Sequence, residues 1–239
     1  MKTLVIAAVL PALLLMIYIY RKDKIEKEPA NLIIKLVIFG GLTVISAVIL
    51  ELTGSWILGR FYDDEETAYK IIENFVIVAG AEEGGKYFIL KRKTWNSPEF
   101  NYSYDAVVYA VAVSLGFATV ENILYVVTGG FGVAIVRALL SVPGHAVFAV
   151  YMGYYYGVAK KASVNGRISA EESNRTKAYI IPVFLHGFYD FCLSMQSGKF
   201  IGIFLVFDIL MVVSAARKVN KLSANDAPLS EQPYYSDYM

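Results

Sequence analysis

The stretch of sequence that decides the fold is GVAIVRALLSVPGHAVFAVYMGYYYGV, residues 132–158. Arg137 is its only permanently charged residue, and His145 lies near its middle. A helix of about 20 apolar residues spans the ~30 Å hydrocarbon core of a bilayer. The stretch therefore predicts a transmembrane helix that carries an ionisable group at membrane depth, which is costly unless the group serves a polar site.

The composition of the whole chain agrees with a membrane protein. Hydrophobic residues make up 56% of the 239 residues and charged residues only 18%, too much apolar surface for a water-soluble core of this size. The net charge of +1 by itself says nothing about nucleic-acid binding, and we expect no nucleic-acid partner. Cys192 is the only cysteine, which excludes an intrachain disulfide and a cysteine-based metal cluster.

Apolar runs of similar length recur along the chain and predict an all-α, polytopic bundle of about seven transmembrane helices. The predicted spans are residues 3–20, 32–57, 68–90, 105–127, 132–158, 178–195 and 200–216. The first span runs directly into Arg21-Lys22-Asp23-Lys24 without a small-residue cleavage site. It therefore predicts a helix rather than a cleavable signal peptide.

The loops between these spans differ in charge. Basic residues gather in segments 21–30, 91–104 and 159–177 and after residue 216, whereas the opposite loops are acidic (58–67) or short and poor in base. The positive-inside rule then places the N-terminus outside and the C-terminus in the cytoplasm. We expect residues 1–218 to form the transmembrane domain and the polar residues 219–239 to form a disordered cytoplasmic tail.

The third span contains the sequence Glu82-Glu83-Gly84-Gly85-Lys86. Glu82 and Lys86 are four residues apart and share a helix face, so they can pair. Glu83 is rotated by about 100° and is expected to stay free, as a general base requires. The two glycines allow another helix or an extended substrate to approach closely. The alternative is a packed ion pair with no catalytic role.

Glu121 lies well inside the fourth span, and Arg137 lies at a similar depth in the fifth. Because the turn between these spans centres near residue 129, the hairpin brings the two residues together as an ion pair. Such a pair is a structural explanation for Glu121, but a paired carboxylate can still orient a neighbouring catalytic group.

The two histidines of the chain lie in consecutive spans. His145 follows Pro143-Gly144, and the proline is expected to kink the helix. His186 shares a helix face with Asp190, whose carboxylate can fix the imidazole tautomer. Antiparallel helices would place both imidazoles at one depth. The alternative is that each is an ordinary buried histidine.

Four motifs in order on four consecutive spans resemble those of the PrsW family of membrane proteases. They are Glu82-Glu83-x-x-Lys86, Phe117-x-x-x-Glu121, His145 and His186-x-x-x-Asp190. The family resembles the wider group of CAAX-type prenyl endopeptidases and bacteriocin-processing proteins, in which the first motif ends in arginine and the second usually in histidine. The resemblance covers residues 1–218, and Glu121 favours PrsW itself.

This resemblance implies a protease of the bacterial plasma membrane. Its expected substrate is a single-span anti-sigma factor, which it cuts first on the extracytoplasmic side so that an envelope-stress sigma factor is later released. The expected catalytic residues are Glu82, Glu83, His145 and His186, and the expected supporting residues are Lys86, Phe117, Glu121 and Asp190.

Two mechanisms stay open at this point. In the first, which we favour, Glu83 or Glu82 activates water while the histidines act by hydrogen bonding and proton transfer. In the second, zinc binds His145, His186 and a glutamate such as Glu83, although no His-Glu-x-x-His motif is present. The alternatives to a protease are a proton-coupled transporter and a non-catalytic membrane scaffold.

Overall fold

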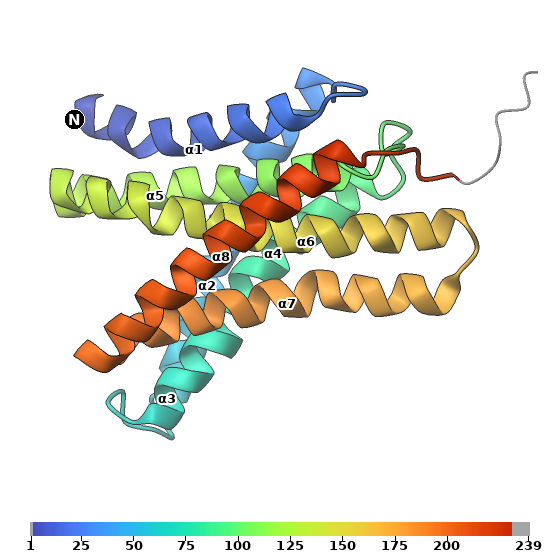
Figure 1. Cartoon of the computed structure of the whole chain (residues 1–239). Helices are drawn as coiled ribbons and strands as arrows, with labels where there is room; N and C mark the ends of the chain where they lie inside the picture. The colour runs from blue at the N-terminus through green and yellow to red at the C-terminus, as the bar shows by residue number, and fades with distance from the viewer. Residues whose placement is uncertain (1, 231–239) are drawn as a thin grey trace, which may run out of the picture.

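The computed structural model describes residues 2–230, which form helices and connecting loops with one isolated β-bridge (Figure 1). The helices in chain order are α1 (Lys2–Lys22), α2 (Ala30–Leu58), α3 (Thr67–Ile71), the π-helix η1 (Ile72–Val78), α4 (Ala79–Thr94), α5 (Asp105–Leu139), α6 (Ser141–Val164), α7 (Ile168–Ser194) and α8 (Gly198–Ala224). The predicted all-α fold is confirmed for these residues.

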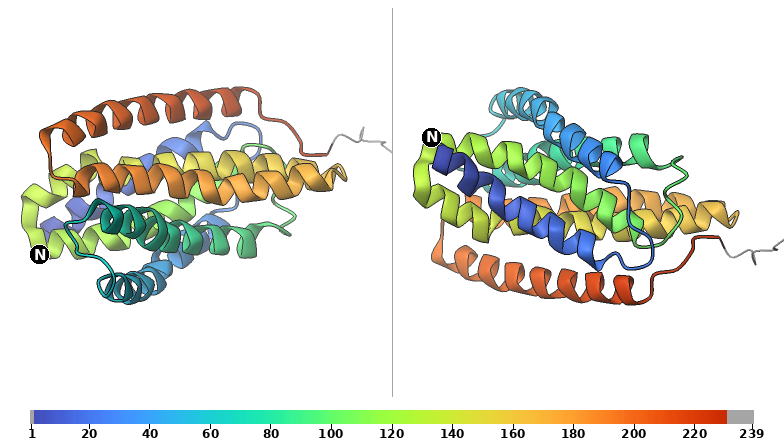
Figure 2. Two further views of the ribbon diagram at one scale, coloured as in Figure 1. Left: turned by 90° about the horizontal axis from the view of Figure 1, so that it is seen from below. Right: turned by 90° about the horizontal axis from the view of Figure 1, so that it is seen from above.

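Four helical segments of the described chain are long and apolar enough to cross a membrane: α1, α2, the continuous pair α5–α6, and α8. They make the chain a multi-pass membrane protein. Helices α4 and α7 are less apolar because they carry the charged residues of the third and sixth predicted spans. Figure 2 shows α2 along one flank of the bundle and α8 along the other, with α4 to α7 between them.

The chain reverses direction at Gly130, which lies inside the segment assigned to α5. Its φ of 78° and ψ of −165° are not helical, and glycine adopts such a positive φ without steric cost. The turn predicted near residue 129 is therefore confirmed. The expected break near Pro143 is also present: α5 ends at Leu139, α6 begins at Ser141, and Leu140 between them has a φ of −118°. The missing N–H and the ring of Pro143 explain this interruption.

Helix α4 packs closely against two neighbours through its double glycine. A Cβ at Gly85 would lie 3.2 Å from the Cβ of Thr43 on α2, and one at Gly84 would lie 3.6 Å from the Tyr179 ring on α7. The expectation that these glycines admit another helix is confirmed. The helix also continues to Thr94, beyond the predicted end at residue 90.

The expected boundary at residue 218 falls inside α8, which continues to Ala224. Beyond the helix, Leu229 is buried, and its N–H donates to the carbonyl of Asn101 at 2.8 Å. The prediction of disorder is therefore wrong for residues 219–230, because apolar side chains at the end of α8 and Leu229 pack against the bundle. Residues 231–239 of that predicted tail lie outside the described residues.

Candidate active site

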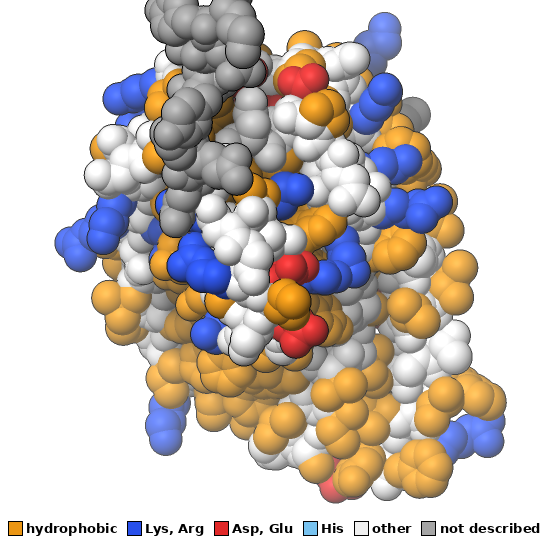
Figure 3. Space-filling view, turned by 90° about the vertical axis from the view of Figure 1, so that its right-hand side faces the viewer, with side chains coloured by type: hydrophobic (Ala, Val, Ile, Leu, Met, Phe, Trp, Pro, Cys, Tyr) orange, Lys and Arg blue, Asp and Glu red, His pale blue; other side chains and the backbone are white. Residues whose placement is uncertain are grey.

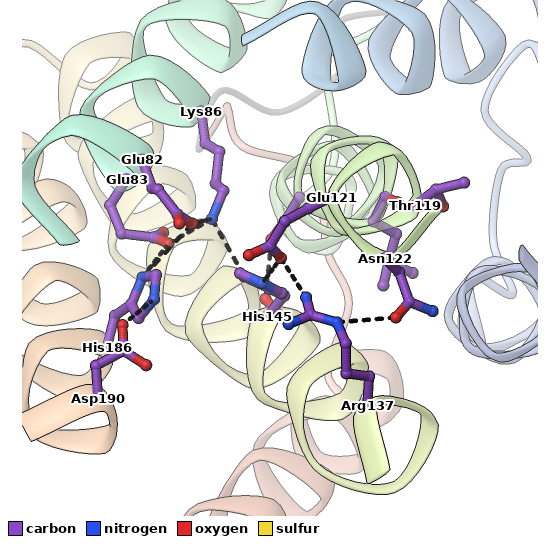
Figure 4. A network of polar contacts seen from close by, with 12 residues as sticks. Glu82, Glu83, Lys86, Thr119, Glu121, Asn122, Arg137, His145, His186 and Asp190 are labelled. Atoms are coloured by element: carbon purple, nitrogen blue, oxygen red, sulfur yellow. Dashed lines mark hydrogen bonds and ion pairs between the residues drawn. The ribbon is translucent and has the colours of Figure 1, made fainter. Parts of the chain in front are cut away.

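The residues singled out in the sequence meet in one polar network inside the bundle (Figure 4). Helix α4 supplies Glu82, Glu83 and Lys86, α5 supplies Glu121, α6 supplies His145, and α7 supplies His186 with Asp190. Hydrogen bonds and ion pairs connect them without a break from Asp190 to Glu121. The structure therefore brings these side chains together in one connected site.

Lys86 is the centre of the network and is fully buried. Its Nζ lies 2.7 Å from Glu83 Oε1 and 3.0 Å from Glu82 Oε2. The expected Glu82–Lys86 pair is confirmed, but the expectation that Glu83 stays free is wrong, because the long lysine side chain reaches residues three and four positions back. The ammonium also lies 4.0 Å from the centre of the Phe117 ring, a cation–π contact that gives Phe117 its place in the site.

His145 lies between this lysine and Glu121. Its Nδ1 is 3.2 Å from Lys86 Nζ, and its Nε2 is 3.0 Å from Glu121 Oε2. An ammonium group only donates, so Nδ1 accepts and the proton of the ring is on Nε2, which donates to Glu121. The predicted Glu121–Arg137 ion pair is confirmed at 2.6 Å. Arg137 also donates to Asn122, a residue that the sequence gave no reason to select.

His186 has a carboxylate at each ring nitrogen. Nδ1 lies 3.1 Å from Glu83 Oε1, and Nε2 lies 3.1 Å from Asp190 Oδ2. The predicted contact with Asp190 is therefore confirmed. Because a carboxylate only accepts hydrogen bonds, both ring nitrogens must donate if both carboxylates are ionised. The ring of Phe148 stacks on this imidazole with centroids 4.9 Å apart, which fixes its plane.

The two imidazoles are close to each other, with ring centroids 5.5 Å apart. The prediction that they lie at one depth is confirmed. Each is 4% exposed and held by charged partners from other helices. They therefore belong to one polar centre rather than to two separate packing positions.

A cavity of about 450 Å³ opens beside this centre. Its polar lining side chains are Glu51, Asn74, Glu82, Glu121, Tyr125, Arg137, Ser141, His145, His186, Tyr189 and Asp190. Glu83 is not among them and is fully buried behind Glu82. A substrate or a water molecule in the cavity therefore meets the carboxylate of Glu82 before that of Glu83.

The lining includes residues whose role the sequence did not reveal. Glu51, Asn74 and Tyr125 line the cavity but belong to none of the four sequence motifs. Asn74 lies in the π-helix η1, a type of helix that is often found at functional sites. A search for polar residues within two turns of the motif residues could have found Tyr125, Ser141 and Tyr189, but not Glu51 or Asn74.

Three side chains of the centre have the donor types that zinc prefers. Ligand atoms of Glu82, Glu83 and His145 lie within 4.8 Å of one another. The expected set of His145, His186 and Glu83 is different, and both nitrogens of His186 are engaged by carboxylates. However, Lys86 Nζ lies within 3.2 Å of all three grouped side chains. In this arrangement the ammonium fills the place that a zinc ion would need.

Comparison with known proteins agrees with the geometry. Residues 28–216 match the family described as PrsW family intramembrane metalloprotease. The chain belongs to this family. The resemblance predicted from the four motifs is confirmed, and the chain is a membrane-embedded protease. The description as a metalloprotease is a property of the family, and the lysine among the grouped donors does not fit it in this structure.

The relatives match along nearly the whole chain. This chain is 35% identical to Protease PrsW of Geobacillus kaustophilus over 238 residues, which cover 99% of both chains. It is 37% identical to Protease PrsW of Oceanobacillus iheyensis, over 94% of this chain and 98% of the relative. For Protease PrsW of Bacillus subtilis the identity is 32%, over 83% of this chain and 86% of the relative. No solved structure matches the chain significantly.

Proposed function

We propose that this PrsW-family protease makes the first, extracytoplasmic cut in a single-span anti-sigma factor of the bacterial plasma membrane. The observation that carries the proposal is the position of the cavity along the bundle. The cavity lies nearer the acidic end of the molecule than the basic end.

The two ends of the bundle differ in charge. Lys and Arg side chains gather on the end that carries the α1–α2 and α6–α7 connections (Figure 3). The loop at the other end holds Asp63, Asp64, Glu65 and Glu66. The positive-inside rule then supports a cytoplasmic basic end, with seven spans, the N-terminus outside and the C-terminus inside.

The cavity lining comes from the helix parts nearest the acidic end. Glu51 lies in the last two turns of α2, and Asn74 follows the acidic loop in η1. Tyr125 and Arg137 flank the turn at Gly130, and Leu193 precedes the end of α7 at Ser194. A peptide bond in this cavity would lie toward the extracytoplasmic side of the membrane.

The arrangement suggests a role for each side chain in hydrolysis. Glu82, which borders the cavity, removes a proton from the attacking water. The imidazoles of His145 and His186 lie beside it, with their N–H groups on Glu121, Glu83 and Asp190. When the substrate displaces these carboxylates, the N–H groups donate to the developing oxyanion, and His186, which carries two ring protons, supplies one to the leaving amine. Glu83, which we expected to be the base, instead holds Lys86 and His186 in position. Lys86 offsets the charge of the two adjacent glutamates.

The test is cleavage by the purified protein in proteoliposomes. The substrate is an anti-sigma factor-like single-span protein with a different tag at each end, and mass spectrometry of the fragments locates the cut. We expect a cut in the half of the substrate on the side of the acidic loop, and none with Glu82→Gln. Glu172→Gln, which neutralises an exposed glutamate at the basic end, is the matched control and should cleave normally.

A cut on the cytoplasmic side would contradict the proposed position of the site. An uncut substrate, with equal protein recovery, would favour the alternatives of a proton-coupled transporter or a scaffold. A proton-flux measurement on the same vesicles separates these two, since only the transporter dissipates a pH gradient.

A further inference from the structure

A second group of buried carboxylates lies at the basic end of the bundle, away from the cavity. Asp23 follows α1, Glu28 precedes α2, and Asp105 is the first residue of α5. They are 1%, 3% and 1% exposed, and one oxygen of each lies within 4.8 Å of the other two. We call these three residues the inner acid cluster. Segments far apart in the chain build it, which no spacing in the sequence reveals.

Several oxygens of the inner acid cluster have no partner. Among the described residues, no hydrogen bond of ordinary geometry reaches the two carboxylate oxygens of Asp23 or Oδ1 of Asp105, although all three atoms are buried. Glu28 lies beside both residues, with its backbone N–H near the Asp23 carboxylate and its carboxyl group near that of Asp105. The other oxygen of Asp105 accepts from the N–H groups of Asn101 and Tyr102. Glu28 accepts a hydrogen bond from the Tyr109 hydroxyl. Buried carboxylate oxygens without partners are costly.

The charges nearby do not balance the cluster. The ammonium of Lys27 donates to the backbone carbonyls of Tyr20 and Asp23 rather than to a carboxylate. Asp226, after α8, adds a further negative charge, and its Oδ2 is also buried without a hydrogen bond in the described chain.

We propose that the inner acid cluster binds a hard divalent cation, Ca²⁺ or Mg²⁺. Both ions take carboxylate oxygens as ligands, and oxygens up to about 5 Å apart can share one Ca²⁺ at the usual 2.3–2.6 Å. The free oxygens of Asp23 and Asp105 are the ligands that the cluster offers without breaking a hydrogen bond. Water can complete the coordination sphere.

A cation here would tie together three parts of the molecule. Asp23 and Glu28 bound the α1–α2 loop, and Asp105 begins α5. The segment after α8 is already joined to the same place, because Asp226 Oδ1 accepts from Ser103 Oγ at 2.9 Å and from the Tyr104 N–H at 2.8 Å. The site therefore stabilises the basic end of the bundle and is separate from the proteolytic site.

The test uses the full-length protein, purified in detergent and stripped of metal with a chelator. Calorimetric titration with CaCl₂ and with MgCl₂ measures binding, and thermal unfolding measures stabilisation. We expect one ion per chain and a Tm rise of about 5 °C or more at a hundredfold excess over the Kd. Asp23→Asn should abolish both effects. Glu26→Gln, which neutralises an exposed glutamate in the same loop, should retain them.

Absence of binding by both ions up to about 10 mM, beyond the weakest class of protein sites, would overturn the proposal. Equal binding by Asp23→Asn would overturn it as well. If that variant fails to fold, the unmutated protein still gives an answer. Tb³⁺ in the cluster should be excited through the adjacent Tyr109 ring, with emission that CaCl₂ quenches by displacement. Emission that is absent or insensitive to CaCl₂ would contradict the site.

Discussion

The two buried acid clusters of this membrane protein differ in their counter-charges. In the proposed proteolytic centre, Glu82 and Glu83 share the ammonium of Lys86, and Glu121 pairs with Arg137. In the inner acid cluster, the nearby cation Lys27 donates to backbone carbonyls instead, and no described side-chain cation hydrogen-bonds to Asp23 or Asp105. Isolating an ion from water costs several kcal/mol unless a partner compensates. The first cluster carries its cations in its own sequence, whereas we infer that the second takes one from solution.

The largest effect should follow from removing the carboxylate that faces the cavity. Glu82→Gln should lower the rate of substrate cleavage by about 10²–10⁴-fold or more, because the general base is lost. Glu83→Gln should also lose cleavage, and it should unfold more readily, since Lys86 and His186 then lose a buried partner. Cleavage rates at matched protein recovery, together with thermal unfolding, measure both. Wild-type cleavage by either variant would refute the site as described.

The internal cation can be removed directly. Lys86→Met leaves two buried carboxylates without their ammonium, so the free energy of unfolding should fall by about 3–5 kcal/mol and cleavage should be lost. Denaturant unfolding in detergent provides the measurement. Lys86→Arg keeps the positive charge and serves as the control. A Lys86→Met protein as stable as the wild type would show that the lysine does not balance the centre.

A smaller effect is expected at the edge of the network. Asp190 contacts only His186 among the catalytic candidates, so Asp190→Asn should reduce kcat by about 10–100-fold. KM and Tm should change little, because Asp190 positions the imidazole and the cavity keeps its shape. Kinetics with the tagged substrate separate kcat from KM. An unchanged kcat, or a loss explained entirely by unfolding, would argue against this positioning role.

The smallest effect on catalysis is expected from a chelator, and its different effects on cleavage and on stability should distinguish the two clusters. Metal removal should change the cleavage rate by less than about twofold, because Lys86 Nζ lies among the donors of Glu82, Glu83 and His145. It should lower Tm through the inner acid cluster. Elemental analysis accompanies both assays. Stoichiometric zinc that is lost together with activity in His145→Ala and His186→Ala would instead establish the metal-dependent route.

The parts of the site that the sequence predicted are those set by helix geometry. Four-residue spacing placed Lys86 beside Glu82 and Asp190 beside His186, and the hairpin placed Arg137 beside Glu121. These contacts depend only on the helical repeat and on the position of one turn. The same reasoning recovered the apolar helices and the chain reversal at Gly130.

The parts that the sequence did not predict depend on side-chain reach and on packing between distant segments. Glu83 was expected to be unpaired but forms an ion pair with Lys86, because the flexible lysine side chain reaches it. A helical wheel does not show this contact. The sequence does not reveal the inner acid cluster, because Asp23, Glu28 and Asp105 lie near the ends of different helices and no regular spacing connects them. The order found beyond residue 218 depends on Leu229 packing against the bundle, and polar composition gave no sign of it.

The π-helix η1 immediately before α4 has a consequence for how this site is encoded. Each residue of an α-helix advances about 100° around its axis, and a π-helical segment holds an extra residue relative to the α-helix it interrupts. Deleting one residue between Ile72 and Val78 would rotate α4 about its axis relative to the acidic loop. Glu82, Glu83 and Lys86 would then all point away from the histidines. Hydropathy and all four motifs would survive such a deletion intact. The number of residues in η1, which contains none of the motif residues, thus sets the rotation of α4 about its axis and so the direction in which its motif residues point.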